Sequence, residues 1–177
     1  MITLNNKKKQ RKKKQRQKKT EIDFIYADIE TLTGSGNEAF WYGCVCRGTD
    51  NDYRVYTNFK DFFNAITQQR KGHKTVVVFH NSKFDISYIQ YHCRHELGFT
   101  HNPKKKGQTK AIYDSQATEI YIDNPLNPVY IVDSINLIPG SLDSWGDFFG
   151  LPKGITPIQE YWREPTDDEV EYVIRDV

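Results

Sequence analysis

The sequence predicts an α/β or α+β domain built around a mixed sheet. Three short apolar runs have the composition of buried strands, at residues 23–30, 75–79 and 129–132. Segments with helical spacing follow the first strands and then alternate with later ones. This order is typical of a mixed sheet flanked by helices. A length of 177 residues suits one domain with its own core.

The first half of the globular part contains three further expected elements after the opening strand, Asp23–Glu30. Ala39–Arg47 and Tyr53–Thr57 should be strands, with a hairpin turn at Gly48–Asp52 between them. Phe59, Phe62, Phe63 and Ile66 have helical spacing, and Asn58 is a suitable N-cap. These elements precede Thr75–Phe79, a β-branched core strand.

The second half is expected to alternate between helices and short strands. A helix should run from about Phe84 to Leu97 and end at Gly98. Lys104–Lys110 reads as a basic loop and Asn124–Pro128 as a turn. The short strands expected around them are Ala111–Tyr113, Glu119–Ile122 and Val129–Val132. Leu142–Phe149 should be a helix closed by Gly150, and the last helix should start at Thr166 with a capping box to Glu169.

The composition favours a folded protein with no membrane partner. Hydrophobic residues make up 37% and aromatic residues 14% of the chain. No apolar run approaches the roughly 18 residues that a membrane span needs. The basic N-terminus is not followed by the apolar segment of a secretory signal. We therefore expect a cytoplasmic protein, in a host or virus-infected cell, or a nuclear one if the host has a nucleus.

The net charge of +2 conceals a basic tail and an acidic body. Of the 25 Lys and Arg residues, ten lie in residues 7–19, which contain no acid. The other 15 are outnumbered by 23 acidic residues, so the rest of the chain has a net charge of −8. We expect residues 1–20 to be a disordered tail that contacts nucleic-acid phosphates, and residues 21–177 to form the domain. A localisation signal or a merely solubilising tail is the alternative.

The three cysteines do not form a disulfide or zinc pattern. Cys44 and Cys46 lack a second pair, and His92, Cys93 and His95 lack a partner cluster. Reduced side chains with structural roles are therefore expected.

Carboxylates occur at three places where a site could form. Asp28 and Glu30 are two residues apart at a strand end, so both point to one face. Asp85 follows a strand and a short polar turn, and Tyr172 and Asp176 share a face of the last helix. Each feature alone is more often an ordinary surface or cap residue. Together they suit a two-metal phosphodiester hydrolase, in which the ions activate water and stabilise the leaving oxygen.

The order of these residues resembles the three exonuclease motifs of family B DNA polymerases. The motifs are D-I-E-T (Asp28–Thr31), N-x-x-F-D (Asn81–Asp85) and Y-x-x-x-D (Tyr172–Asp176). The segments Phe79–Asp85 and Asp133–Pro139 are similar to those of the protein-primed polymerases of small bacteriophages and linear plasmids, as is Lys153-Gly154 followed by a tyrosine. The resemblance covers about residues 23–177. It implies a ribonuclease H-like exonuclease fold with a mixed central sheet flanked by helices.

The resemblance also implies a function and a set of roles. The domain would be a proofreading 3′→5′ exonuclease acting on the single-stranded 3′ end of DNA with two divalent ions, Mg²⁺ or Mn²⁺. The expected metal ligands are Asp28, Glu30, Asp85 and Asp176, with Tyr172 positioning the water and Lys153 stabilising charge. The residues expected to hold the DNA end are Thr31, Asn81, Phe84, Ser134 and Tyr161, with Trp162 as the rival of Tyr161.

Two features leave alternatives open. The sequence ends one residue after Asp176 and contains no polymerase palm motif. We therefore expect a fragment, a split subunit or a stand-alone relative of an enzyme whose longer form would carry a polymerase domain and could use a terminal-protein primer. An RNA-directed exonuclease of the same superfamily places His where Glu171 stands here. A nucleic-acid-binding module without catalysis is the third interpretation.

Overall fold

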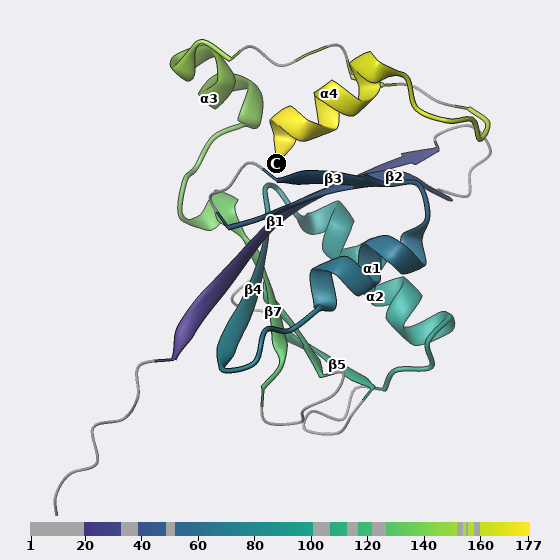
Figure 1. Cartoon of the computed structure of the whole chain (residues 1–177), viewed down its shortest axis with the longest axis vertical. Helices are drawn as coiled ribbons and strands as arrows, with labels where there is room; N and C mark the ends of the chain where they lie inside the picture. The colour runs from purple at the N-terminus through teal and green to yellow at the C-terminus, as the bar shows by residue number, and fades with distance from the viewer. Residues whose placement is uncertain are drawn as a thin grey trace, which may run out of the picture.

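The computed structural model describes residues 20–32, 39–48, 52–100, 107–112, 117–121, 127–151, 154, 156–157 and 160–177. Within this part of the chain, seven strands form one sheet in the order β3-β2-β1-β4-β7-β6-β5 (Figure 1). The tail expected over residues 1–20 lies outside the described residues except for Thr20, so its disorder and its contacts stay predictions.

The sheet is mixed, as the sequence predicted. Its strands are β1 (Glu21–Leu32), β2 (Ala39–Arg47), β3 (Tyr53–Tyr56), β4 (His73–Phe79), β5 (Gln108–Ile112), β6 (Ala117–Tyr121) and β7 (Val129–Asp133). The central strands β1, β4 and β7 are parallel neighbours, and the outer pairs on both sides are antiparallel. The carboxyl ends of the three central strands therefore meet at one edge of the sheet.

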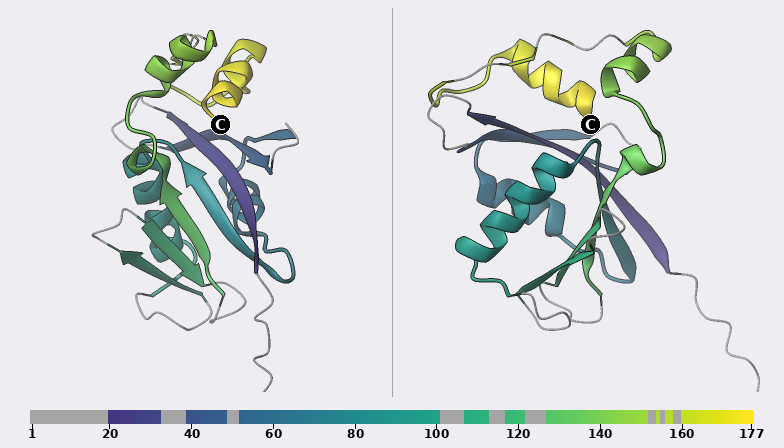
Figure 2. Two further views of the ribbon diagram at one scale, coloured as in Figure 1. Left: turned by 90° about the vertical axis from the view of Figure 1, so that its left-hand side faces the viewer. Right: turned by 180° about the vertical axis from the view of Figure 1, so that it is seen from behind.

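The helices lie on both sides of this sheet (Figure 2). The first two, α1 (Phe59–Thr67) and α2 (Lys83–His95), pack on one face; a short 3₁₀ turn, η1 (Ser134–Asn136), follows β7. The last two are α3 (Leu142–Phe149) and α4 (Asp167–Asp176), and α4 crosses the other face over β1 and β2.

The alternating pattern of β1 divides the core in two. Ile25, Ala27 and Ile29 join the main core with α1 and α2, while the alternate residues point to the opposite face. On that face Trp41, Tyr42 and Cys44 of β2 pack against Val173 of α4 in a smaller core. The smaller core fixes α4 above the end of β1.

Close packing explains the glycine in the middle of β2. A Cβ atom on Gly43 would lie 2.7 Å from Cδ2 of Phe62, a fully buried residue of α1. Glycine thus lets α1 approach the sheet, at the conformational cost that glycine carries in a strand.

Most predicted elements are confirmed, with shifts at their ends. The N-caps at Asn58 and Thr166, the latter with its capping box, and the helix closed by Gly150 all occur. The helix expected to reach Leu97 ends at His95. The chain then turns at Gly98 (φ 65°), and the Phe99 amide donates to the carbonyl of Cys93.

The basic loop expected at Lys104–Lys110 is wrong in its last residues, because β5 begins at Gln108. Antiparallel pairing with β6 overrides the polar local sequence there. Ile122, the expected end of the next strand, lies outside the described residues.

The cysteines are buried thiols. Cys44, Cys46 and Cys93 are all buried and form no disulfide with a described residue, and burial raises the pKa of the Cys44 and Cys93 thiols to about 12. In the described residues no cysteine belongs to a cluster that could hold a metal. No described helix is both long and apolar enough to span a membrane.

Candidate metal centre

Two strand-end acids and one helix acid converge on the α4 side of the sheet. Asp28 and Glu30 lie opposite Cys44 and Tyr42 of β2, on the face that α4 covers. Asp176 is the last helical residue of α4. One carboxylate oxygen of each acid lies within 4.8 Å of the others, and all three residues are half-buried.

This donor set fits a divalent cation. Three carboxylates at such distances repel one another, and a cation between them removes that repulsion. Mg²⁺ and Mn²⁺ bind carboxylate oxygens by preference. Asp28 and Glu30 share a face of β1, as their spacing predicted, and Asp176 joins them from α4, which covers that face.

The three acids line a cleft of about 430 Å³ together with Asp85. Its walls come from the end of β1, the start of α2, the segment after β7, the start of α3 and α4. Its other lining residues are Ile29, His80, Asn81, Phe84, Ile135, Gly140, Ser141, Leu142, Asp143 and Tyr172. Asp85 thus shares the cleft of the three-acid cluster without belonging to the cluster itself.

Asp85 is a buried acid with a carboxylate oxygen that could bind a cation. Its side chain is 5% exposed, and its Oδ1 atom accepts no hydrogen bond from the described residues. Burial raises the pKa of Asp85 to about 7, and the negative charge of Asp133 adds to this, although the backbone amides of Asp85 and Ile29 oppose it. A cation nearby would stabilise the ionised form of this buried carboxyl group.

Asp133 holds the turn that carries the second motif. Its buried carboxylate accepts from the backbone amides of Asn81, Ser82 and Ile135, each at 3.0 Å. Because β4 and β7 are parallel neighbours that end together, Asp133 ties the turn after one strand to the turn after the other. The sequence interpretation assigned Asp133 no role. Its position directly after an apolar strand, at the edge where the other acids lie, was the available signal.

Asn81 has a backbone conformation that few residues adopt. Its φ of 54° is the one positive value of a non-glycine residue in the described chain. Asparagine tolerates this left-handed region better than residues other than glycine. The strained turn places Asn81 on the cleft wall, where its side chain was expected to contact DNA.

Substitutions at Asn81 should separate its backbone role from its side-chain role. We expect Asn81→Ala to lower the free energy of unfolding by about 1 kcal/mol, because alanine is strained at this φ. Asn81→Gly should change it by less than about 0.5 kcal/mol. Urea denaturation of both variants checks this. Equal losses in both variants would contradict a conformational role.

His80 also lines the cleft and hydrogen-bonds to two other segments that form it. One ring nitrogen, Nδ1, lies 2.9 Å from the Ser134 hydroxyl, and the other, Nε2, lies 2.8 Å from the carbonyl of Gly140. A carbonyl only accepts, so Nε2 carries a proton. His80 therefore joins the ends of β4 and β7 to the segment that leads into α3.

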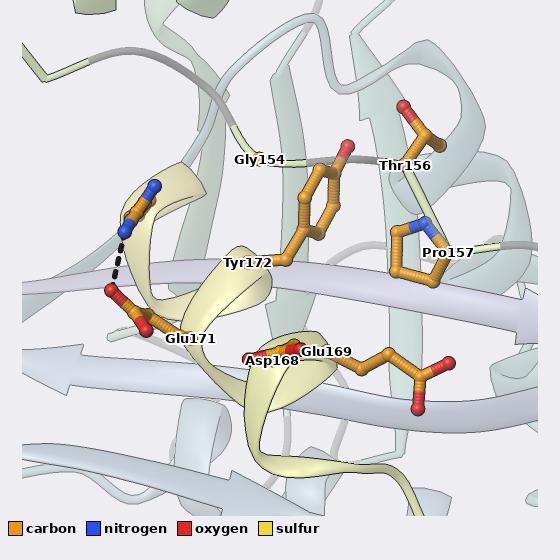
Figure 3. Close-up of a pocket in the computed structure, with 8 residues that line it drawn as sticks. Gly154, Thr156, Pro157, Asp168, Glu169, Glu171 and Tyr172 are labelled. Atoms are coloured by element: carbon orange, nitrogen blue, oxygen red, sulfur yellow. Dashed lines mark hydrogen bonds and ion pairs between the residues drawn. The ribbon is translucent and has the colours of Figure 1, made fainter.

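Tyr172 lies between the acidic cleft and a second cavity. It is 4% exposed and lines both the cleft and a cavity of about 500 Å³ beside α4. Figure 3 shows its ring pointing toward Gly154 and Thr156. A Cβ atom on Gly154 would lie 3.5 Å from Cδ2 of Tyr172. This is an ordinary van der Waals distance, so the backbone at Gly154 passes directly beside the tyrosine ring.

The start of α4 is fixed by a network around Glu169. The Glu169 carboxylate accepts from both terminal nitrogens of Arg163, at 2.8 and 2.6 Å, and from the amide and hydroxyl of Thr166, at 2.7 and 2.9 Å. These interactions lower the pKa of Glu169 to about 2, and the hydrogen bonds from Arg163 have the largest effect. Trp41 donates from Nε1 to the carbonyl of Arg163, which ties the network to β2.

This network should make stability depend on acid pH. A carboxyl whose pKa is depressed in the folded state stabilises the fold above its unfolded pKa and loses that effect as pH falls toward 2. We expect Glu169→Gln to cost about 1–2 kcal/mol at neutral pH and to flatten the loss of stability between about pH 5 and 2. Urea denaturation at both ends of this range measures the effect.

The exposed Glu171, paired with Arg175 (Figure 3), is the matched control. Glu171→Gln should cost at most about 0.5 kcal/mol, and an equal effect of both substitutions would contradict the network's role.

The other expected site residues are placed unevenly. Phe84 is 39% exposed and lines the cleft, as Asn81 does. Among the described residues, Thr31, Ser134, Tyr161 and Trp162 do not line it, and the last two are 71% and 55% exposed. Lys153 lies outside the described residues. The DNA-holding role of each of these residues stays a prediction.

The comparisons place this fold among known structures. Phi29 DNA polymerase complexed with primer-template DNA, as a post-translocation binary complex, matches with a TM-score of 0.70 and 18% identity. The same polymerase complexed with single-stranded DNA matches with a TM-score of 0.69 and 18% identity. Each match covers 88% of this chain but 29% of the polymerase chain.

The structural matches confirm the α/β, ribonuclease H-like fold that the motif resemblance implied. At this identity the likeness establishes the fold alone. No protein-family model matches the sequence, and a search of curated proteins finds no match.

Proposed function

We propose that this chain is a 3′→5′ exonuclease of the proofreading type, which hydrolyses the last phosphodiester bond of single-stranded DNA. The observation that carries the proposal is the convergence of Asp28, Glu30 and Asp176 in one cleft with the buried Asp85. Such a set of acids is typical of phosphodiester hydrolases that use divalent ions. The shared fold with a polymerase solved with single-stranded DNA adds support.

The chain's own residues would position the reactants around this site. Asp28, Glu30, Asp85 and Asp176 would hold two divalent ions, Mg²⁺ or Mn²⁺. When bound, the ions would supply a nucleophile from water and stabilise the leaving oxygen. Tyr172, at the edge of the cleft, would orient the attacking water through its hydroxyl, and Lys153 would stabilise charge at the scissile phosphate.

The DNA end would enter from the side of the second motif. Phe84 offers an exposed ring at the cleft for a base to stack on, and Asn81 offers an amide beside it. Thr31, Ser134 and Tyr161 would contact the strand further out. The acids of the cleft repel phosphates when no cation is present, so binding of DNA in the cleft should depend on divalent ions.

The basic tail would add contacts that do not depend on sequence. Its ten Lys and Arg residues would attract the phosphate backbone, and this attraction weakens as salt rises. The chain spans 29% of the length of the polymerases that it matches. In a longer parent protein, a polymerase domain would accompany this chain, and a terminal-protein primer would be a binding partner.

End-labelled DNA tests the proposal. A single-stranded oligonucleotide carrying a 5′ label is incubated with the purified chain and Mg²⁺ or Mn²⁺. We expect labelled products that shorten stepwise, and a block at the 3′ end should stop them. Shortening from the 5′ end would contradict the proposal. Faster cleavage of RNA would favour the RNA-directed interpretation, and binding without cleavage would favour the binding module.

A further inference from the structure

Three arginines converge on another, polar cavity, which is separate from the acidic cleft and from the cavity beside α4. Arg47 ends β2, Arg54 lies in β3, and Arg70 lies between α1 and β4. All three line a cavity of about 290 Å³. Its other lining residues are Val45, Asp52, Tyr56, Ala65 and Gln68. Guanidinium groups from three separate segments therefore face one space.

This cavity lies on the opposite face of the sheet from the metal centre. Arg47 and Arg70 pair with Asp23, which shares its face of β1 with the core residues Ile25 and Ala27. Asp28 points to the other face. Five residues along a strand also separate Asp23 from Asp28 by about 16 Å. The two sites are distinct.

The acids at the cavity do not balance its arginines. Asp23 lies 3.2 Å from Arg47 and 3.6 Å from Arg70, and Asp52 lies 2.9 Å from Arg54. Among the described residues, three cations therefore share two anions. Burial lowers the pKa of Arg47, and the charges of Arg70 and Arg54 lower it further, while Asp23 opposes them. An additional anion would offset this repulsion.

Within the part of the chain that the structure describes, the guanidinium groups keep N–H donors that make no hydrogen bond. Arg47 donates to the carbonyl and side chain of Gln68 at the end of α1, yet its buried Nε has no hydrogen-bond partner among the described residues. The side chains of Arg54 and Arg70 are 67% and 58% exposed, and each makes one ion pair with a described residue. Each guanidinium has five N–H donors in a planar fork, which suits the oxygens of a phosphate.

We propose that this arginine cavity binds a phosphate group. A volume of about 290 Å³ holds a phosphate, alone or with part of a sugar, and is small for larger ligands. The phosphate could belong to a free monoester or to the backbone of a nucleic acid. Arg54 and Arg70 would hold the phosphate by bidentate hydrogen bonds, and the positive charge of the more buried Arg47 would attract it.

The test is a titration of the isotope-labelled full chain, followed by NMR. Inorganic phosphate should shift the backbone amides of Arg47, Gln68 and Arg70. The variant Arg54→Ala/Arg70→Ala should weaken this response about tenfold, because two charge-assisted contacts are lost. Lys60→Ala/Lys71→Ala is the matched control, since it removes two exposed charges, one from α1 and one next to Arg70 in sequence, that do not line the cavity.

The outcomes decide both the site and its source. Thymidine monophosphate and a single-stranded oligothymidylate are titrated in the same way. The concentrations of the two probes are compared per phosphate group. If the amides shift at a lower concentration of the oligonucleotide, the site binds a nucleic-acid backbone. If they shift at an equal or lower concentration of thymidine monophosphate, the site binds free phosphate monoesters. Unshifted amides with all three probes would overturn the proposal. An equal response of the arginine and lysine variants would also overturn it, and their unligated spectra verify that both are folded.

Discussion

Asp28→Asn combined with Glu30→Gln is expected to reduce DNA hydrolysis by about 10²–10³-fold or more, the effect of removing preorganised charge from a reaction site. Both side chains belong to the three-acid cluster, and the substitutions keep their size. The same change removes repulsion between neighbouring carboxylates, so the melting temperature without metal should stay equal or rise. Rates on labelled DNA and thermal unfolding measure the two effects.

A matched pair of exposed acids controls for the loss of negative charge. Asp147→Asn combined with Glu160→Gln makes the same chemical changes outside the cleft. We expect the activity of this variant to stay within about twofold of the original. Equal activity of the original chain and the cluster variant would show that Asp28 and Glu30 do not take part in hydrolysis.

Asp133→Ala is expected to lower the free energy of unfolding by about 3–5 kcal/mol, because three backbone amides lose a charged acceptor. All three are close to the cleft, at Asn81, Ser82 and Ile135. Loss of the acceptor should also let the turn carrying Asn81 move, which would weaken DNA hydrolysis. Urea denaturation and the DNA assay measure the two effects.

Two further variants serve as controls for Asp133→Ala. Asp133→Asn removes the charge but keeps the size of the side chain, and Asp147→Ala removes an exposed carboxylate elsewhere. The amide of Asn keeps one acceptor oxygen, so Asp133→Asn should cost less than Asp133→Ala. The exposed Asp147 should change stability by less than about 0.5 kcal/mol. If Asp133→Ala costs no more than Asp147→Ala, the carboxylate does not hold the turn.

Local patterns in the sequence were sufficient to predict most elements. The alternation in β1 predicts both the main core and the shared face of Asp28 and Glu30, because a strand has a side-chain period of two. The cap at Thr166 is also local, since its partner Glu169 is three residues away. The start of β5 could not be predicted in this way, because pairing with β6 determines it.

The arrangement of the site depends on contacts between distant segments. Asp133 and Asn81 are 52 residues apart, and their hydrogen bond exists because β4 and β7 are parallel neighbours. Asp176 joins Asp28 and Glu30 because Val173 packs against Trp41 and Tyr42. The arginine cavity likewise joins three segments that have no common sequence motif.

The identity of the released product tests the central claim most directly. A DNA oligonucleotide labelled in its last nucleotide is incubated with the chain and Mg²⁺ or Mn²⁺, and the label is identified by chromatography. Release as a nucleoside 5′-monophosphate, absent in Asp28→Asn/Glu30→Gln and after chelation of the metal, is the predicted result. Release in a longer fragment, release as a 3′-monophosphate, or no release by the original chain would contradict the proposed exonuclease.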